Sequence, residues 1–172
     1  ISSALSDSLN ISSLTKKLFN INLLVDSDFK LIDSSYVDNK FLWLGKGAIA
    51  LDNSASYQWL FIKELDSLEI VGNLDFEKIV RKTLKDVQPN IDLISHFDKY
   101  FKLADNKDQC IYKMNSIYNH NLYKTGGPLI AYLIEDKIKN KTIIFYGLVN
   151  APGKSKMKHI KELETIIINS NF

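Results

Sequence analysis

The sequence is poor in cysteine, methionine and proline. Its single cysteine, Cys110, cannot form a disulfide within the chain, which excludes a small secreted scaffold held together by disulfides. A chain of 172 residues should bury about 70% of the surface of its unfolded form, so it does not need disulfides to be stable. Apolar residues make up 45% and charged residues 24% of the chain, which is typical of a folded globular domain.

A strong charge of either sign and a long apolar run are also lacking. Lysine and arginine together number 22, and aspartate and glutamate number 20, which leaves a formal charge of +2. Nucleic-acid binders usually have a strongly basic balance, so we expect no nucleic-acid partner. No apolar run is long enough to span a membrane. Since the first residue is Ile1 rather than methionine, we expect these residues to be part of a longer protein.

Apolar residues at helical spacing predict three helices. The first could be interrupted at Asn10. The second has one apolar face, Asp75 as its predicted N-cap, and Pro89 beyond its end. The stretch Asn90–Leu103 is ambiguous and would suit another short helix. The three predicted helices are Ser2–Phe19, Asp75–Val87 and Lys154–Ser170.

Short apolar and aromatic runs, separated by residues that favour turns, predict strands. They are Leu23–Val25, Phe29–Ile32, Phe41–Leu44, Tyr57–Ile62, Cys110–Tyr118, Pro128–Glu135 and Thr142–Asn150. Runs of strands without an intervening helix favour antiparallel pairing, because parallel pairs need a crossover. We therefore expect an α+β fold, with a single antiparallel β-sheet and helices packed on it. Residues 20–172 would form one domain, and residues 1–19 a helical segment that joins it to a missing upstream domain.

Residues Gly153–Ser155 follow a predicted strand and open a predicted helix, which is the setting of a phosphate-binding loop. The two glycines that would bound this loop enclose five residues, whereas the motif requires four, so the pattern does not indicate a nucleotide hydrolase. Lys154, Lys156 and Lys158 crowd the start of the helix, where the helix dipole disfavours cations. They are either solvated lysines or, together with the helix amides, a site for an anion.

No constellation of side chains specifies a reaction or a metal. The three histidines, His96, His120 and His159, are far apart in the sequence, and none lies at a ligand spacing from another His, Cys or Glu. Cys110, in a predicted strand, is interpreted as a small buried apolar residue rather than a nucleophile. We therefore predict no metal, no cofactor and no catalytic residue, and we favour a non-enzymatic domain over an enzyme.

Two glycine–proline segments are the sharpest local patterns. In Gly126–Pro128 the two glycines allow positive φ or a close backbone approach, and the proline fixes the start of the next strand. In Asn150–Gly153 a strand ends, a turn forms and a helix begins. Both segments are interpreted first as structural turns and strand starts. They are also possible contact points for a partner, which gives the candidate binding residues Gly126, Gly127, Pro128, Pro152, Gly153, Lys154, Lys156 and Lys158.

The same segments carry a resemblance to a known family. The chain resembles the C-terminal half of the Bacteroidota lipoproteins known as domain of unknown function 4837, over roughly Leu14 to Phe172. The similar segments are Gly126–Leu129 with Ala131-Tyr132, Gly147–Gly153, Lys161–Ile166, and upstream Lys17–Phe19, Phe29 and Phe41–Leu44. The chain departs from the family pattern at Tyr118, Thr125, Leu129 and Leu148. The order of helices and strands also resembles the PsbP and Mog1 type of α+β domain.

The resemblance implies a location and no reaction. Family members carry a lipoprotein signal and a further N-terminal domain, so we expect a cell-envelope protein that reaches the outer membrane only through a missing N-terminal lipid anchor. The predicted function is a non-enzymatic domain that binds an envelope protein partner or polymer. Two alternatives stay open: an enzyme or small-ligand binder with a pocket between sheet and helices, and an accessory subunit of an outer-membrane assembly.

Overall fold

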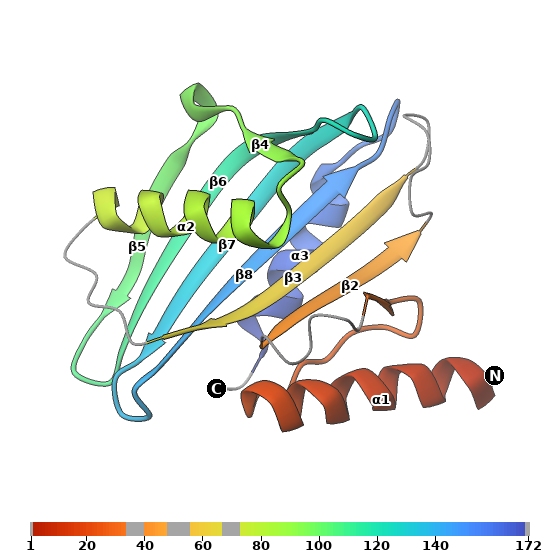
Figure 1. Ribbon diagram of the computed structural model, residues 1–172. Helices are drawn as coiled ribbons and strands as arrows, with labels where there is room; N and C mark the ends of the chain where they lie inside the picture. The colour runs from red at the N-terminus through yellow and green to blue at the C-terminus, as the bar shows by residue number, and fades with distance from the viewer. Residues whose placement is uncertain (1, 34–39, 48–55, 67–72, 171–172) are drawn as a thin grey trace.

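The computed structural model describes residues 2–33, 40–47, 56–66 and 73–170. This part of the chain forms one eight-stranded antiparallel sheet with helices packed on it, which confirms the predicted fold class (Figure 1). The helices are α1 (Ser2–Phe19), α2 (Asn73–Val87), the short 3-10 helix η2 (Ser95–Phe97) and α3 (Met157–Ile168). The strands are β1 (Lys30–Asp33), β2 (Phe41–Gly47), β3 (Tyr57–Leu65), β4 (Ile91–Leu93), β5 (Lys99–Asp105), β6 (Gln109–His120), β7 (Thr125–Asp136) and β8 (Lys141–Asn150).

The strands follow the order β1-β2-β3-β8-β7-β6-β4, and β5 also pairs with β6. The last strand in the sequence, β8, lies inside the sheet between β3 and β7. Every residue from Thr142 to Asn150 is buried, because helices cover the sheet on both faces. This double cover explains why the segment is apolar at almost every position instead of alternating with polar residues.

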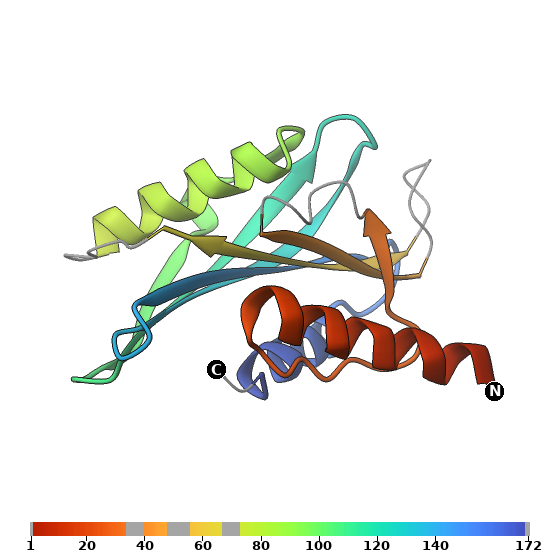
Figure 2. The same cartoon turned by 60° about the horizontal axis from the view of Figure 1, so that its bottom comes forward.

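Helix α2 covers one face of the sheet (Figure 2). Its residues Phe76, Val80 and Leu84 are spaced four apart and are fully buried, as the apolar face of the sequence predicts. They pack against aromatic side chains of the sheet, including Tyr112 and Tyr146. The buried hydroxyl of Tyr146 donates a hydrogen bond of 2.8 Å to the carbonyl oxygen of Val80, so this polar group is satisfied.

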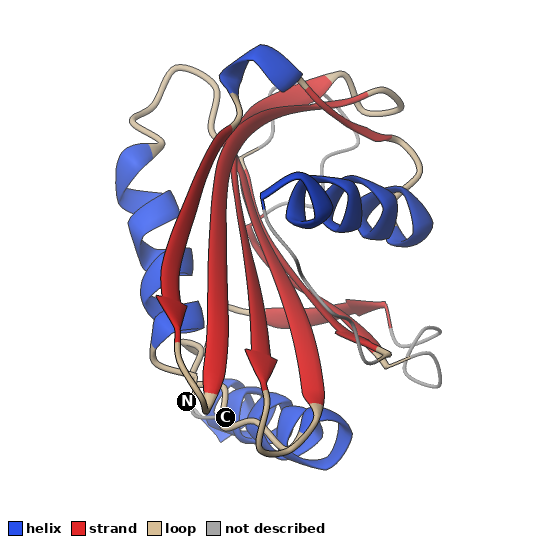
Figure 3. Ribbon diagram, turned by 90° about the vertical axis from the view of Figure 1, so that its left-hand side faces the viewer, coloured by secondary structure: helices blue, strands red, loops and turns tan. Residues whose placement is uncertain are grey.

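Helices α1 and α3 lie on the opposite face (Figure 3). Helix α3 buries Leu163 and Ile167, and α1 contributes Ile11 and Phe19 to the same core. Helix α1 runs without a break, so the interruption expected at Asn10 does not occur. The sheet thus has an apolar core on each face.

The stretch Asn90–Leu103, which is ambiguous in the sequence and would suit a short helix, forms β4, η2 and β5 instead. Ile91 pairs with His120 of β6, and β5 pairs with the first half of the same strand. The helical spacing was misleading because Phe97 and Phe101, which suggested a buried helix face, are 46% and 41% exposed. Pairing with β6 overrides the local pattern.

Three smaller expectations also need correction. Leu23–Val25 forms no strand: Leu23 is buried against the core, and Leu24 is 68% exposed. Helix α2 starts at Asn73, so Asp75 lies within its first turn and is not the N-cap. Helix α3 starts at Met157, so the preceding residues from Lys154 onward belong to the connection from β8.

Arg81, the only arginine of the chain, links α2 to the sheet through an ion pair. The guanidinium of Arg81 forms an ion pair with Asp98, whose side chain is 2% exposed, and its Nε donates to Glu77 at 3.2 Å. Asp98 also accepts hydrogen bonds from the hydroxyls of Ser116 and Tyr100. One buried carboxylate therefore connects a helix with β5 and β6.

Replacing Arg81 with methionine leaves the buried charge of Asp98 without its cation. We expect Arg81→Met to lower the free energy of unfolding by about 3 kcal/mol, measured by urea denaturation. The control is Lys82→Met, which removes an exposed ion pair with Asp86 and should cost less than about 1 kcal/mol. Equal stability of the two variants would show that the Arg81–Asp98 pair does not hold α2.

Candidate functional site

Both candidate segments of the sequence lie at the same end of the sheet. Gly126 and Gly127 do not precede the strand, as its predicted start at Pro128 implied: they belong to the start of β7, where Gly127 pairs with Tyr118 of β6. The turn lies at Asn121–Lys124, and Lys124 takes the left-handed backbone conformation, with φ of 55°. The strand starts earlier than predicted because the register with β6 continues to the pair His120–Thr125.

A contact at Gly127 joins the start of β7 to the β8–α3 connection. A methyl group on Gly127 would lie 2.1 Å from the carbonyl oxygen of Val149 and 3.7 Å from Cδ of Lys156. Next to it, the amide of Gly126 donates to Oδ1 of Asn150 at 3.4 Å. Gly127 is therefore required for a close approach of two backbones, one of the two roles considered for this glycine pair.

The β8–α3 connection is on the surface. Pro152, Gly153, Lys154 and Lys158 are exposed, and Lys156 is half-buried. Gly153 has φ of 66°, and no atom lies within 4 Å of the position where its Cβ would be. Helix α3 begins after Lys156 without a side-chain cap and without an acidic residue in its first turn. These residues are accessible to a partner rather than enclosed in the core.

A cleft opens beside this connection, between the sheet and α3. It has a volume of about 160 Å³, and mostly apolar atoms face it. Its walls come from the ends of β2 and β8, the start of β3 and the first turn of α3. The lining residues are Lys46, Gly47, Ser56, Tyr57, Gln58, Asn150, Ala151 and His159.

Five polar residues form a hydrogen-bonded network along this cleft, which we call the cleft network: Asp26, Lys46, Gln58, His159 and Glu162. The side-chain nitrogen of Gln58 lies 2.6 Å from Nδ1 of His159 and donates to Oε2 of Glu162 at 3.1 Å. The ammonium of Lys46 donates to Oδ2 of Asp26 at 2.6 Å and to Oε1 of Glu162 at 2.8 Å. Gln58 is only 5% exposed, so the network links β3 firmly to α3.

The charges of the cleft network stabilise one another. Burial alone would raise the pKa of Asp26, but hydrogen bonds from Lys46 and from the amide of Asp28 hold the pKa below its usual value. Burial likewise opposes the charge of Lys46, but its hydrogen bonds to Asp26 and Glu162 raise its pKa above the ordinary value. These groups stay ionised at neutral pH and are engaged with each other, so they stiffen the wall rather than act as acid or base.

Sequence reasoning missed most of the cleft network. His159 was considered without partners because Gln58 is 101 residues away in the chain. A local signal existed in α3, where His159 and Glu162 are three residues apart and share a helix face. A second signal was Gln58, a polar residue inside an otherwise apolar predicted strand. Nothing in the sequence pointed to Lys46 and Asp26, which meet only through the fold.

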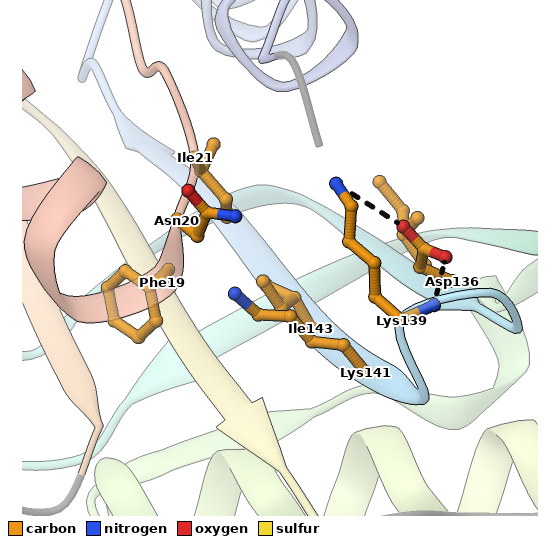
Figure 4. Close-up of a pocket in the computed structure, with 8 residues that line it drawn as sticks. Phe19, Asn20, Ile21, Asp136, Lys139, Lys141 and Ile143 are labelled. Carbon is orange, nitrogen blue, oxygen red and sulfur yellow. Dashed lines mark hydrogen bonds and ion pairs between the residues drawn. The ribbon is translucent and has the colours of Figure 1, made fainter.

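Two other cavities in the described part of the chain are less suited to a ligand. Figure 4 shows the one between Phe19 at the end of α1 and the β7–β8 hairpin, where Lys139 is turned toward Asp136. Its volume of about 10 Å³ is at the limit for a single water. A wider, open depression of about 440 Å³ lies between β3 and α2, and there charged side chains pair with each other, as Lys40 does with Glu64 at 2.7 Å.

Buried aromatic and sulfur-containing residues behave as core residues, as predicted. Trp59 is fully buried, and Cys110 is 4% exposed. Within the described ranges, no three or more His, Cys, Asp or Glu side chains are grouped so that they could hold a metal. No described helix is both long and apolar enough to cross a membrane.

Fold and site together define an α+β domain with an apolar-walled cleft at one end of its sheet. A family model described as Domain of unknown function (DUF4837) matches residues 8–169, so the chain belongs to this family. No curated protein matches. Among solved structures, the crystal structure of LpqN, involved in cell envelope biogenesis of Mycobacterium tuberculosis, is 12% identical with a TM-score of 0.47. The match covers 88% of this chain and 82% of LpqN, and at this level it carries no argument about function.

The close approach at Gly127 gives a stability test. We expect Gly127→Ala to lower the free energy of unfolding by about 2 kcal/mol or more, because the added methyl group meets the carbonyl of Val149. Gly153→Ala is the matched control, since its methyl group meets nothing and only the left-handed backbone costs about 1 kcal/mol. A Gly127 variant no less stable than the Gly153 variant in urea denaturation would contradict this geometry.

Buried His120 makes the domain sensitive to acid. It is 3% exposed and stacks on Tyr123, whose amide donates to its Nδ1 at 3.2 Å. Burial lowers the pKa of His120 below the ordinary value of 6.5. The unfolded chain therefore takes up this proton more readily, so stability is complete above about pH 6.5 and falls as the pH drops below it.

We expect the free energy of unfolding to drop when the pH is lowered from 7.5 to 5.5. This drop should be smaller in His120→Asn than in the unsubstituted chain. The exposed His96 supplies the control, since His96→Asn should retain the full drop. If His120→Asn also retains the full drop, other groups cause the acid sensitivity.

Proposed function

We propose that this chain is a non-enzymatic domain of the cell envelope that binds a protein partner through the cleft and the exposed β8–α3 connection. Membership of the DUF4837 family supports the envelope location through the lipoprotein character of the family that the sequence resembles. On the same ground we propose that the whole protein is anchored to the outer membrane of a Bacteroidota cell by an N-terminal lipid.

The observation that carries the proposal is the composition of the cleft wall. Most hydrogen-bonding groups of the cleft network are used internally, the exception being the buried Oε1 of Gln58, which has no partner among the described residues, and mostly apolar atoms face the open space. Such a wall suits one apolar side chain of a protein better than the hydroxyl groups of a polysaccharide, which need free donors and acceptors. Among the two partner classes expected from the sequence, the geometry therefore favours a protein.

The size of the cleft also bears on the alternatives. Small-molecule and cofactor sites usually have volumes of about 300–1,000 Å³, and enclose most of the ligand. The cleft, at about 160 Å³, is smaller and has room for one projecting group rather than a whole substrate. The polar groups beside it hold each other in place, which leaves no free pair of acid and base next to it. These features favour a docking role over catalysis.

Filling the cleft tests the proposal. The full-length protein, gently solubilised from the envelope, should retain a specific partner in a pull-down, and Ser56→Leu should reduce that recovery about tenfold or more by occupying the space. Ser13→Leu is the matched control, because Ser13 is exposed on α1.

Thermal melting should show that both variants fold. Equal recovery of the partner by the two variants would contradict binding in the cleft. Recovery of the protein alone from the envelope would contradict a stable protein partner altogether.

A further inference from the structure

The end of the molecule that contains the cleft has an unbalanced positive charge. Residues 119–134 and 142–161 contain no aspartate or glutamate. Five lysines of these segments have no ion pair among the described residues: Lys124, Lys154, Lys156, Lys158 and, farther along α3, Lys161. Two lysines at the hairpins of the opposite end are paired, Lys137 with Asp105 at 3.2 Å and Lys139 with Asp136 at 3.6 Å.

Three large apolar side chains are exposed on the same end. Phe97 of η2 is 46% exposed, Leu122 of the β6–β7 turn is 64% exposed, and Met157 at the start of α3 is 62% exposed. Figures 1 and 3 show all three at the upper end of the molecule, where the β6–β7 turn and the β8–α3 connection lie at one corner in Figure 1 and η2 lies at the other. Single exposed apolar residues are normal on a protein surface, but here Leu122 and Met157 lie on the same connections as the unpaired lysines, and Phe97 lies farther along the same end.

Hydrogen bonds hold these connections to the sheet. The amide of Ile94, just before η2, donates to the carbonyl of Ile117 on β6 at 2.9 Å. The contact of Gly126 with Asn150 joins the β6–β7 turn region to the β8–α3 connection. The lysines and the apolar side chains are thus presented by one rigid end of the sheet, which we call the basic rim: Phe97, Leu122, Lys124, Lys154, Lys156, Met157 and Lys158.

We propose that the basic rim is a docking surface for an anionic lipid bilayer. Lysines at a membrane surface are attracted by anionic headgroups, and apolar side chains between them enter the boundary between headgroups and acyl chains. The amides of the first turn of α3, which lack a side-chain cap, add donors for headgroup phosphates. An acidic protein would not need the three apolar side chains, so the combination favours a bilayer. This surface shares the β8–α3 connection with the proposed protein site but not the cleft, and it does not depend on a partner in the cleft.

Vesicle co-sedimentation of the purified chain tests the proposal. The chain should bind vesicles of phosphatidylcholine with added phosphatidylglycerol, and it should not bind vesicles of phosphatidylcholine alone. Binding should weaken between about 0.1 M and 1 M salt, because the screening length falls from about 10 Å to about 3 Å.

The variants assign the binding to the basic rim. Changing Lys154, Lys156 and Lys158 together to glutamine should weaken binding about 100-fold, since each lysine contributes about fivefold. The control changes three exposed lysines elsewhere, Lys16, Lys78 and Lys107, to glutamine, which gives the same net charge and should weaken binding less than about threefold. A Leu122→Ser, Met157→Ser variant should also bind more weakly while the salt dependence persists.

Two results would overturn the proposal. Equal losses in the two lysine variants would mean that only net charge matters. Binding to soluble polyglutamate without binding to anionic vesicles would mean that the rim recognises an acidic macromolecule. Because the three lysines do not line the cleft, the pull-down with Ser56→Leu remains an independent test of the protein partner.

Discussion

The position of β8 between β3 and β7 is the constraint on which the rest of the structure depends. Its backbone pairs with a strand on each side, and its residues from Thr142 to Asn150 are buried under helices on both faces. A strand held in this way cannot shift without breaking two ladders and two apolar cores. Its end therefore fixes where Asn150 and the start of α3 lie, and with them the wall of the cleft.

The fold class followed from the sequence because its main signals are local. Local patterns indicate which side of a helix or strand is buried. One is the apolar run Thr142–Asn150, and another is the four-residue spacing of Phe76, Val80 and Leu84. The prediction failed over Asn90–Leu103, where pairing with β6, a non-local interaction, decides the structure. Local spacing contains no information about which strand will lie alongside.

The candidate site likewise has parts that local sequence patterns predict and parts that depend on contacts between distant residues. Glycine, proline and lysine patterns marked Gly126–Pro128 and the β8–α3 connection, because unusual backbone positions leave a trace in residue type. These two segments meet near Gly127 and Lys156 only in the folded chain, so the sequence could not predict their contact. The cleft network could not be predicted as a whole, because Lys46 and Asp26 meet Glu162 only after β2 and α3 have packed on the same sheet.

We propose different roles for the helix-covered faces of the sheet and for the end that contains the cleft and the basic rim. Helix α2 and the Arg81–Asp98 pair close one face around an apolar core. The end of the sheet beside α3 instead combines an apolar-walled cleft, accessible connections and lysines without acidic partners. These features have no evident role in stability, which is why we assign function to this end.

Amide hydrogen exchange of the full-length protein in native envelope membranes, compared with the purified protein, tests this assignment most directly. The connections exchange quickly when they are free, so contact with a partner or a bilayer is visible as protection. Our assignment predicts slower exchange in residues 121–127 and 150–161, with the β7–β8 hairpin unchanged. Protection confined to that hairpin or to β5, with none at the cleft end, would contradict it.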